Sequence, residues 1–399
     1  MNTTKRIFCY LLLAALCLLA AAYLAKGFHN LTVGDHVGDA VDLKLRWIEQ
    51  RYFARGINPY DVWIANAGEK LDASVVDKWK TDRPSETVGD IGFQDPAHPP
   101  WSFVTSWVFF WPDWPAARFY YAGLCALAIT FVAWWVYGVI SPYGNFSAWL
   151  TMATVLAIGG GSLTLQVGQY GWLVLALLCA VLWLDGKGRA VQAGIALAFA
   201  VSKPTMGAPF LLSAFVMYRW ATLMVGGSIL LIASLLCWYW ISTNPIDLLR
   251  QALVIGGVIG KDGSVGLTTL IIDLGVDQQY ATLLGMATML GVGIIGLFYS
   301  RRGSLLISFA IAGVIARTWT YHKSYDDLLI VFLLVATAKL AASTQSRLNW
   351  CVFSALALTL VLPSRFAAMV EVQVVQLTVW LAAAIFLIWA SESVRCSSR

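Results

Sequence analysis

The sequence predicts an all-α polytopic membrane protein with about eleven transmembrane helices and one long polar loop. Hydrophobic residues make up 59% of the 399 residues and charged residues only 12%, whereas a soluble domain carries about 25% charged residues. The apolar residues fall in long runs separated by short basic loops, a pattern typical of a helical membrane protein. We therefore expect a single integral membrane domain over residues 1–399, with no linker to a second folded unit.

The net charge and the cysteines narrow the possible classes of function further. The net charge is +5, but the basic residues lie mostly in short loops such as "DGKGR" (185–189), where they orient helices and do not bind nucleic acid. None of the seven cysteines forms a CxxC motif or falls in the long polar loop. We therefore expect no disulfide, no thiolate metal site and no cofactor.

The first apolar run, "MNTTKRIFCYLLLAALCLLAAAYLA", is long enough to span a bilayer, and we expect it to remain as an uncleaved first helix. Lys5 and Arg6 keep its start in the cytoplasm by the positive-inside rule. Residues 27–98 then form an extracytoplasmic loop, 99–335 a membrane core and 336–399 the C-terminal helices. The expected location is the plasma (inner) membrane, crossed many times.

The basic loops stay on one side under two conditions, namely one re-entrant segment and one short hairpin. Segment 99–112 is expected to be the second membrane segment, and segment 145–163, broken by "GGG", is expected to be re-entrant. Segments 190–202 and 206–218 should form a short hairpin that turns outside at "SKPT". The remaining apolar segments lie at about 117–140, 169–184, 222–241, 279–299, 303–318, 327–342, 349–363 and 373–390.

The long loop contains an amphipathic segment, "DLKLRWIEQRYFARG". Val41, Leu45, Ile48 and Tyr52 recur at helical spacing, so the segment is expected to lie flat on the outer membrane surface. Gly56 and Pro59 end it. Asp42 then falls in the first turn, near the positive end of the helix dipole.

Polar residues away from the basic loops share the outer side in this topology. A carboxylate there can take a proton from an attacking hydroxyl, and cations can hold a phosphate leaving group. This combination favours glycosyl transfer from a lipid-phosphate sugar, and no HExxH, Walker A or GxSxG context indicates another chemistry. The residues are Asp35, His36, Asp39, Asp42, "NPYD" (58–61), "HPPW" (98–101), Gln166, Gln169, Lys203, Arg317, Tyr321, His322, Lys323, Asp326 and Asp327.

Five segments in order resemble glycosyltransferase family 87 of the GT-C superfamily over residues 39 to about 335. They are "DLKLRWIEQRYFARGINPYD", "HPPW", "VGQYGWLVLALL", "GIALAFAVSKPT" and "TWTYHKSYDDLLIVFLL". The chain departs from the family pattern at three places. His98 stands where Tyr is usual, Tyr170 and Gly171 replace a Val-Asn pair, and a single His322 replaces a His pair.

The resemblance implies a GT-C-like fold and a metal-independent, inverting transferase that uses a polyprenyl-phosphate sugar, often mannose. The acceptor would be a hydroxyl of a glycolipid or glycan. Asp42 is expected to be the general base, with Asp39 as its nearest rival and His322 as a further catalytic candidate. The donor phosphate is assigned to Lys203, Lys323, Arg317 and Gln169, and the residues flanking the substrates are Tyr60, His98, Trp101, Trp319 and Tyr321.

Each assignment has a structural alternative. Asp42 could cap the helix, Lys203 could extend to the interface and Gln169 could bridge two helices. Tyr60 and Asp61 could form a turn that anchors the amphipathic segment. At the level of function, the alternatives are a lipid-linked sugar transporter or flippase, and a polysaccharide polymerase or ligase.

Overall fold

The protein is helical throughout the part that the computed structural model describes. That part comprises residues 3–36, 38–66, 96, 98–259, 267, 271–272, 274–301, 303–319, 323–367 and 369–397. Six helices in it are long and apolar enough to cross a membrane. The chain is therefore a helical membrane protein, as the composition predicts. The six stretches are Arg6–Thr32, Ala116–Tyr143, Trp220–Ile241, Leu283–Ser300, Ser324–Thr344 and Val370–Ser391.

Shorter elements fill the space between the long helices. Five further apolar helices have 10 to 17 residues each, so the expected total of about eleven crossings stays a prediction. The elements in chain order are α1 (Thr3–Thr32), α2 (Val41–Ala54), α3 (Pro59–Asn66), α5 (Pro100–Thr105), η2 (Trp107–Phe109), α6 (Ala116–Ile140), η3 (Ser141–Tyr143), α7 (Asn145–Leu156), α8 (Gly159–Val167), α9 (Gly171–Asp185), α10 (Ala190–Ala200), α11 (Pro204–Val216), α12 (Trp220–Ile241), α13 (Pro245–Ile259), α15 (Gln278–Ser300), α16 (Leu305–Thr318), η4 (Ser324–Ile330), α17 (Val331–Thr344), α18 (Arg347–Leu360), α19 (Ser364–Ala367) and α20 (Val370–Ser397).

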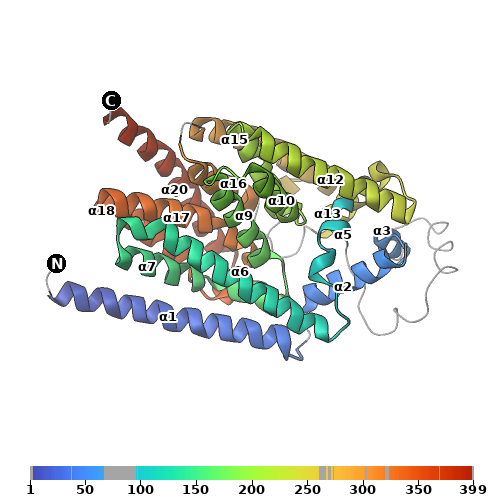
Figure 1. Ribbon diagram of the computed structural model, residues 1–399, viewed down its shortest axis with the longest axis horizontal. Coiled ribbons are helices and arrows are strands. Elements are labelled where there is room, and N and C mark those ends of the chain that lie inside the picture. Colours follow the sequence, from blue (N-terminus) through green and yellow to red (C-terminus); the bar gives the residue numbers. More distant parts are fainter. Residues whose placement is uncertain are drawn as a thin grey trace.

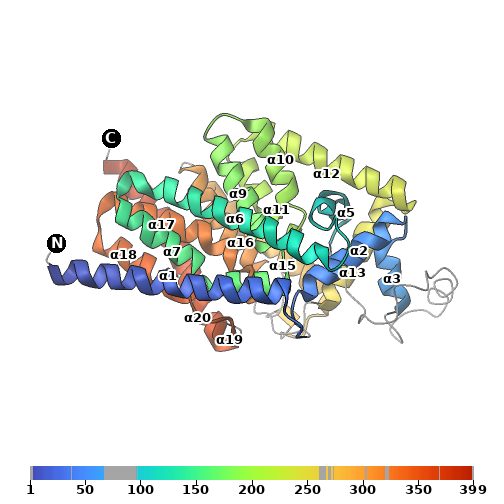
Figure 2. The ribbon, with the colours of Figure 1, turned by 60° about the horizontal axis from the view of Figure 1, so that its bottom comes forward.

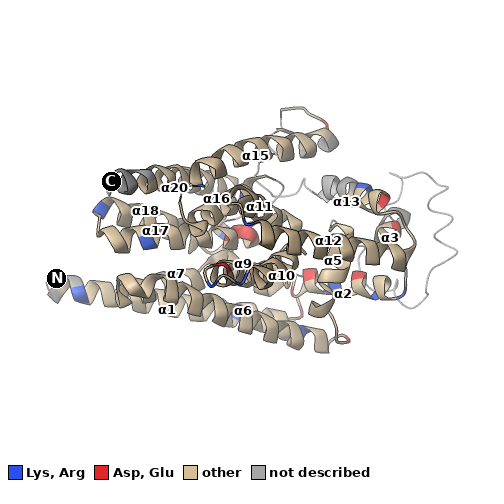
Figure 3. Ribbon diagram, turned by 45° about the horizontal axis from the view of Figure 1, so that its top comes forward, with Lys and Arg blue, Asp and Glu red and all other residues tan. Residues whose placement is uncertain are grey.

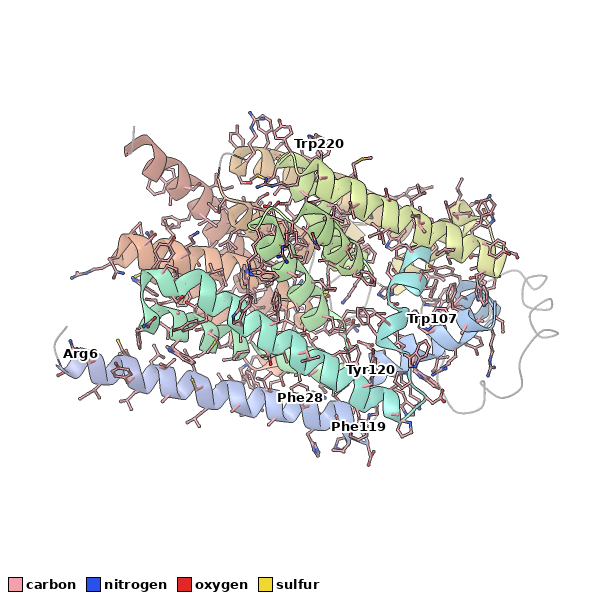
Figure 4. All side chains as sticks on the ribbon, viewed as in Figure 1. Arg6, Phe28, Trp107, Phe119, Tyr120 and Trp220 are labelled. Carbon is pink, nitrogen blue, oxygen red and sulfur yellow. The ribbon has the colours of Figure 1, made fainter. Side chains whose placement is uncertain are left out.

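The helices form an elongated bundle whose two ends differ. Both chain termini lie at one end, and α2, α3 and α5 lie at the other, which we call the α2 end (Figure 1). Figure 4 places Arg6 near the termini and Trp107, Phe119 and Tyr120 toward the α2 end. Figure 3 shows acidic and basic residues on α2 and α3, whereas most of the length of α1 and α6 is uncharged. The long, largely uncharged helices run along the bundle, with charged residues at the α2 end, so we expect the bundle axis to stand perpendicular to the membrane.

The segment expected to be re-entrant runs the length of α1 instead. Tyr10 stacks edge-on against Phe146 at the start of α7, and a Cβ on Gly27 would lie only 2.8 Å from Leu165 Cβ in α8. Tyr10 and Gly27 are separated by about 26 Å along a helix, close to the thickness of the hydrocarbon core. Figure 2 shows α7 beside α1. The α7–α8 pair, bent by 43° at its break, is therefore a broken crossing, and the re-entrant prediction is wrong.

The segment predicted to be the second membrane helix is also different. Residues 99–112 form the six-residue α5 and the three-residue η2 at the α2 end. Neither is long enough to cross a bilayer, which needs about 20 residues. One crossing is lost here and one is gained at α7–α8, so the two errors cancel. The later loops therefore keep the sides of the membrane that the sequence predicts for them. Arg219 bonds Asp185 at 3.1 Å, which joins two of the basic loops.

Two separate hydrophobic cores hold the bundle together. The large core packs the long helices, and it includes Leu43 at the start of α2. A smaller core at the α2 end joins Phe53, Tyr60 and Phe103 to residues of α12 and α13. Helix α2 connects the two cores, and the polar residues of its middle turns lie between them. Glu49 and Gln50 are 5% and 7% exposed, so α2 is more enclosed by protein than a helix lying flat on lipid.

Candidate functional site

The start of α2 is fixed by contacts with the turn after α8. The N-cap is Ala40, in a left-handed conformation with φ 51°, and its N–H donates to Gln166 O at 2.8 Å. Gly168, with φ +74°, lies so close to α2 that a Cβ there would be 2.4 Å from Leu43 Cβ. Only glycine meets both conditions. Because Ala40 caps the helix, the capping role considered for Asp42 is wrong.

Asp42 begins a chain of hydrogen bonds that links four elements. Gln169 Nε2 donates to Asp42 Oδ2 at 2.6 Å, and Lys203 Nζ donates to Gln169 Oε1 at 3.2 Å. Lys203 Nζ also bonds Asp326 Oδ1 at 2.7 Å. The amide of Gln169 thus connects a carboxylate to an ammonium group. We call Asp42, Gln169, Lys203 and Asp326 the polar chain.

Lys203 lies at the turn of the predicted α10–α11 hairpin, which the structure confirms. Gly207 allows the close return, because a Cβ there would be 2.5 Å from Ala200 O. Trp101 Nε1 donates to Val201 O at 3.0 Å, and Ser102 Oγ donates to Ser202 O at 2.6 Å. Pro204 then starts α11 at a position where its missing N–H costs nothing. Lys203 is 6% exposed. The hydrogen bonds to Val201 O and Ser202 O fix the turn that carries it.

The "GGG" segment positions Asp326. A Cβ on Gly160 would lie 2.2 Å from Ser324 O, and one on Gly161 would lie 2.7 Å from Trp172. Thr164 Oγ1 donates to Tyr325 O at 2.8 Å. Gly160 therefore lets α8 pack directly against η4, and Gly161 lets it pack against α9. The contact with η4 places the Asp326 carboxylate beside Lys203.

A second group of polar residues lies next to the polar chain, one turn further along α2. Arg46 Nη1 donates to Glu49 Oε2 at 2.6 Å and lies 2.7 Å from His98 Nδ1. Tyr60 OH donates to His98 O, which ties α3 to the segment before α5. We call Arg46, Glu49 and His98 the histidine group.

The two groups influence each other electrostatically. Burial raises the pKa of Asp42 above its ordinary value, while the Gln169 hydrogen bond and the charges of Arg46, Lys203 and Lys323 oppose this rise. Burial and the nearby Arg46 and Lys203 charges lower the pKa of His98 well below its usual range. A carboxylate with a raised pKa is a stronger proton acceptor. Within the described residues, the Asp42 hydrogen bond from Gln169 goes to Oδ2 and leaves Oδ1 for a substrate.

Arg317 has partners outside the polar chain. Its Nε donates to Asp327 Oδ1 at 2.7 Å, the residue is 1% exposed, and its guanidinium lies 5.7 Å from the Trp380 ring centroid. Unlike Lys203, Arg317 has no hydrogen-bonded link to Asp42 in the described part of the chain, because its carboxylate partner Asp327 faces the helix packing around Trp380. The assignment of Arg317 to the donor phosphate stays a prediction, and the ion pair with Asp327 gives Arg317 a local structural role that is sufficient to explain its burial.

Other predicted site residues have different local partners. Asp39 accepts from His36 N at 3.2 Å and from Gln166 Nε2 at 3.4 Å, so it stabilises the loop before α2. The indoles of Trp101 and Trp319 bond backbone oxygens, the latter that of Thr205 at 2.8 Å. Lys323 is exposed beside η4. Tyr321 and His322 lie outside the described residues.

Three residues of the two groups were not assigned as site residues from the sequence. Arg46 follows Asp42 by four residues, so helical spacing alone places both side chains on one side of α2 and could have identified it. Glu49 is one turn further along the same side. Asp326 carries no such signal, because its partner Lys203 is 123 residues away and only the packing of η4 brings them together.

Comparison with known proteins adds no family assignment. No family model, curated protein or solved structure matches the chain. Among the described residues, no three His, Cys, Asp or Glu side chains lie close enough together to hold a metal ion. The absence of a metal requirement stays a prediction.

Proposed function

We propose that the protein is a membrane glycosyltransferase of GT-C-like architecture, with about eleven membrane crossings once the shorter apolar helices are included. It transfers a hexose, with mannose as the first candidate, from a polyprenyl-phosphate sugar to a hydroxyl of a glycolipid or glycan. The reaction takes place at the extracytoplasmic face, which is the α2 end. The observation that carries the proposal is the bridge from Asp42 through Gln169 to Lys203.

The bridge supports the two functions that the reaction needs. Asp42 takes the proton of the acceptor hydroxyl as its oxygen attacks the anomeric carbon. The bond from that carbon to the phosphate oxygen breaks, and the oxygen leaves with the electron pair. Lys203 stabilises the charge that develops on the phosphate. Attack on the face opposite the leaving group inverts the configuration of the sugar.

The Lys203–Asp326 pair adds a step before the reaction. The ammonium already bonds Asp326 and Gln169, and it lies 5.0 Å from the Tyr325 ring centroid. A donor phosphate must therefore replace Asp326 as the main partner of Lys203. The exchange keeps the ammonium paired throughout, and its main cost is the separation of the buried Asp326 carboxylate from Lys203.

The test is donor consumption by the purified protein in nanodiscs supplied with polyprenyl-phosphate mannose and a mixture of glycolipid acceptors. Asp42→Asn keeps the shape and can still accept the Gln169 hydrogen bond, so only the base is lost. Loss of a general base lowers the rate by about 10²–10⁴. Asp39→Asn is the matched control and should retain near-normal turnover. EDTA in excess should have no effect.

Two results would contradict the proposal. Normal turnover of Asp42→Asn together with an inactive Asp39→Asn would move the base to Asp39. Complete loss of activity in EDTA that is restored by a divalent metal would end the metal-free mechanism.

The transporter or flippase alternative rests on the buried charges, since ionisable residues inside membrane proteins also line transport paths. The same preparation separates the two. In sealed vesicles, a transporter moves the intact donor lipid across the bilayer without breaking the sugar–phosphate bond. The proposed enzyme releases polyprenyl phosphate and forms a new glycolipid.

A further inference from the structure

The histidine group fixes which nitrogen of His98 carries the proton. Arg46 Nη1 lies 2.7 Å from His98 Nδ1. A guanidinium group can only donate, and it does not lose its proton in proteins. Nδ1 must therefore accept, and in the neutral ring the single proton is on Nε2.

Burial and the surrounding charges together keep the ring neutral. Burial opposes protonation of His98 most strongly, the cations Arg46 and Lys203 oppose it further, and the carboxylate of Asp326 favours it. Glu49 is already bonded to Arg46 Nη1, so its charge is largely offset. The remaining neighbours are aromatic hydroxyl residues: Tyr60, which bonds the backbone of His98, and Tyr170, whose ring centroid lies 5.9 Å away edge-on.

In the described part of the chain, the Nε2–H group of His98 has no hydrogen-bond acceptor. The ring is half-buried, and within the described residues its only side-chain hydrogen bond is the one at Nδ1. We propose that His98 is a specificity-determining residue, locked by Arg46 as the neutral Nε2–H form, that donates a hydrogen bond to an uncharged oxygen of the sugar. This inference rests on the proposed function for the identity of its substrate.

The charge distribution explains why the oxygen is uncharged. An anionic phosphate is attracted far more strongly to Lys203 than to a neutral imidazole. The imidazole instead supplies a directional donor of fixed orientation, and discrimination against analogues that lack the bonded group is strong at such sites. The sugar would lie between the phosphate at Lys203 and the base at Asp42, on the side of α2 that carries Arg46.

The tautomer can be measured without any activity. The chain has four histidines, so ¹⁵N-histidine NMR in nanodiscs resolves few signals, and His98→Asn identifies one of them. Where that variant does not fold, His29→Gln with His36→Gln removes two other signals and leaves two to assign. The expected His98 signal is that of a neutral ring with a bare Nδ1, and it stays so below the ordinary histidine pKa of about 6.5. Arg46→Met should free the ring to titrate closer to about 6.5.

Protonation of His98 near its ordinary pKa in the wild type, or a proton on Nδ1, would overturn the inference whatever the activity of the protein.

A second NMR experiment tests the contact with the sugar by comparing polyprenyl-phosphate mannose with polyprenyl phosphate at saturating concentrations. The Nε2–H resonance should shift with the first only. An equal shift with both would mean that His98 contacts the phosphate, and no shift with either would mean that it contacts no part of the donor.

Discussion

Lys203 and Arg317 form two ion pairs with adjacent aspartates, and the two pairs differ in what surrounds them. Both bonds are 2.7 Å long and all four residues are buried. Lys203 has a second acceptor, Gln169, which continues to Asp42 at the α2 end. Arg317 is enclosed by helix packing and the Trp380 ring. In the proposed reaction the first pair exchanges its anion, whereas the second joins η4 to α16.

A buried ion pair is therefore not by itself a sign of function. The sequence places both cations at the same outer junction, and both were assigned to the donor phosphate. What distinguishes them is the second hydrogen-bond partner.

The largest expected effect on stability comes from Arg317→Met. The substitution leaves the Asp327 carboxylate buried without its cation, and breaking such a pair costs about 3–5 kcal/mol. Adding Asp327→Leu removes the unpaired charge and should restore most of the loss, with transferase activity retained. Urea denaturation of the two variants measures the difference. An Arg317→Met/Asp327→Leu protein that is folded but inactive would place Arg317 in the site.

The matched replacement at the other pair should separate folding from activity. Lys203→Met with Asp326→Leu removes both charges, so the free energy of unfolding should change by only about 1–4 kcal/mol, often in the stabilising direction. Activity should nevertheless be lost, because nothing then stabilises the leaving phosphate. Binding of fluorescent polyprenyl phosphate should weaken as well. Retention of donor consumption in this folded variant would exclude Lys203 from the mechanism.

A further prediction concerns the stability of Asp42→Asn. The pKa of Asp42 is raised in the folded protein. Its stabilising contribution is therefore full below the unfolded pKa and is lost as pH rises through the folded value. At neutral pH the ionised carboxylate costs folding free energy. Asp42→Asn should melt at the same temperature as the wild type or higher, and a clear drop in melting temperature would indicate a structural role.

The smallest expected effect is on the pH profile. The rate requires ionised Asp42, so kcat/KM should fall as pH falls through a pKa above the ordinary carboxyl value of about 4. Gln169→Met removes a hydrogen bond that favours the ionised form and should move this limb to higher pH. Asp39→Asn should leave it in place. An unmoved limb in Gln169→Met would mean that Gln169 does not act on the base.

The sequence predicts local features, such as helix starts and turns, better than contacts between residues far apart in the chain. The helix at α2 with Asp42 in its first turn, and the turn at Lys203, follow from spacing and from Pro204, and the structure confirms both. The Lys203–Asp326 and Arg46–His98 contacts join distant segments. They depend on glycine contacts such as those of Gly160 and Gly168, which no hydrophobic pattern encodes.

The two misplaced segments have a common cause. The apolar residues of 99–112 have mixed surroundings: Phe103 and Phe110 pack inside the protein at 2% and 3% exposure, whereas Trp111 is 71% exposed. Apolar composition does not distinguish burial in protein from burial in lipid. The "GGG" at 159–161 suggested a loop, but its glycines serve close packing against Ser324, Trp172 and Leu362 within a broken crossing.

The most direct test of the central claim is a cryo-EM map of the protein with bound polyprenyl-phosphate mannose. Asp42→Asn is the form to use, because it should bind the donor without consuming it. We expect phosphate density within hydrogen-bond distance of Lys203, with Asp326 displaced and the anomeric carbon facing residue 42. Donor density elsewhere, with the Lys203–Asp326 pair intact, would exclude Lys203 as the phosphate ligand.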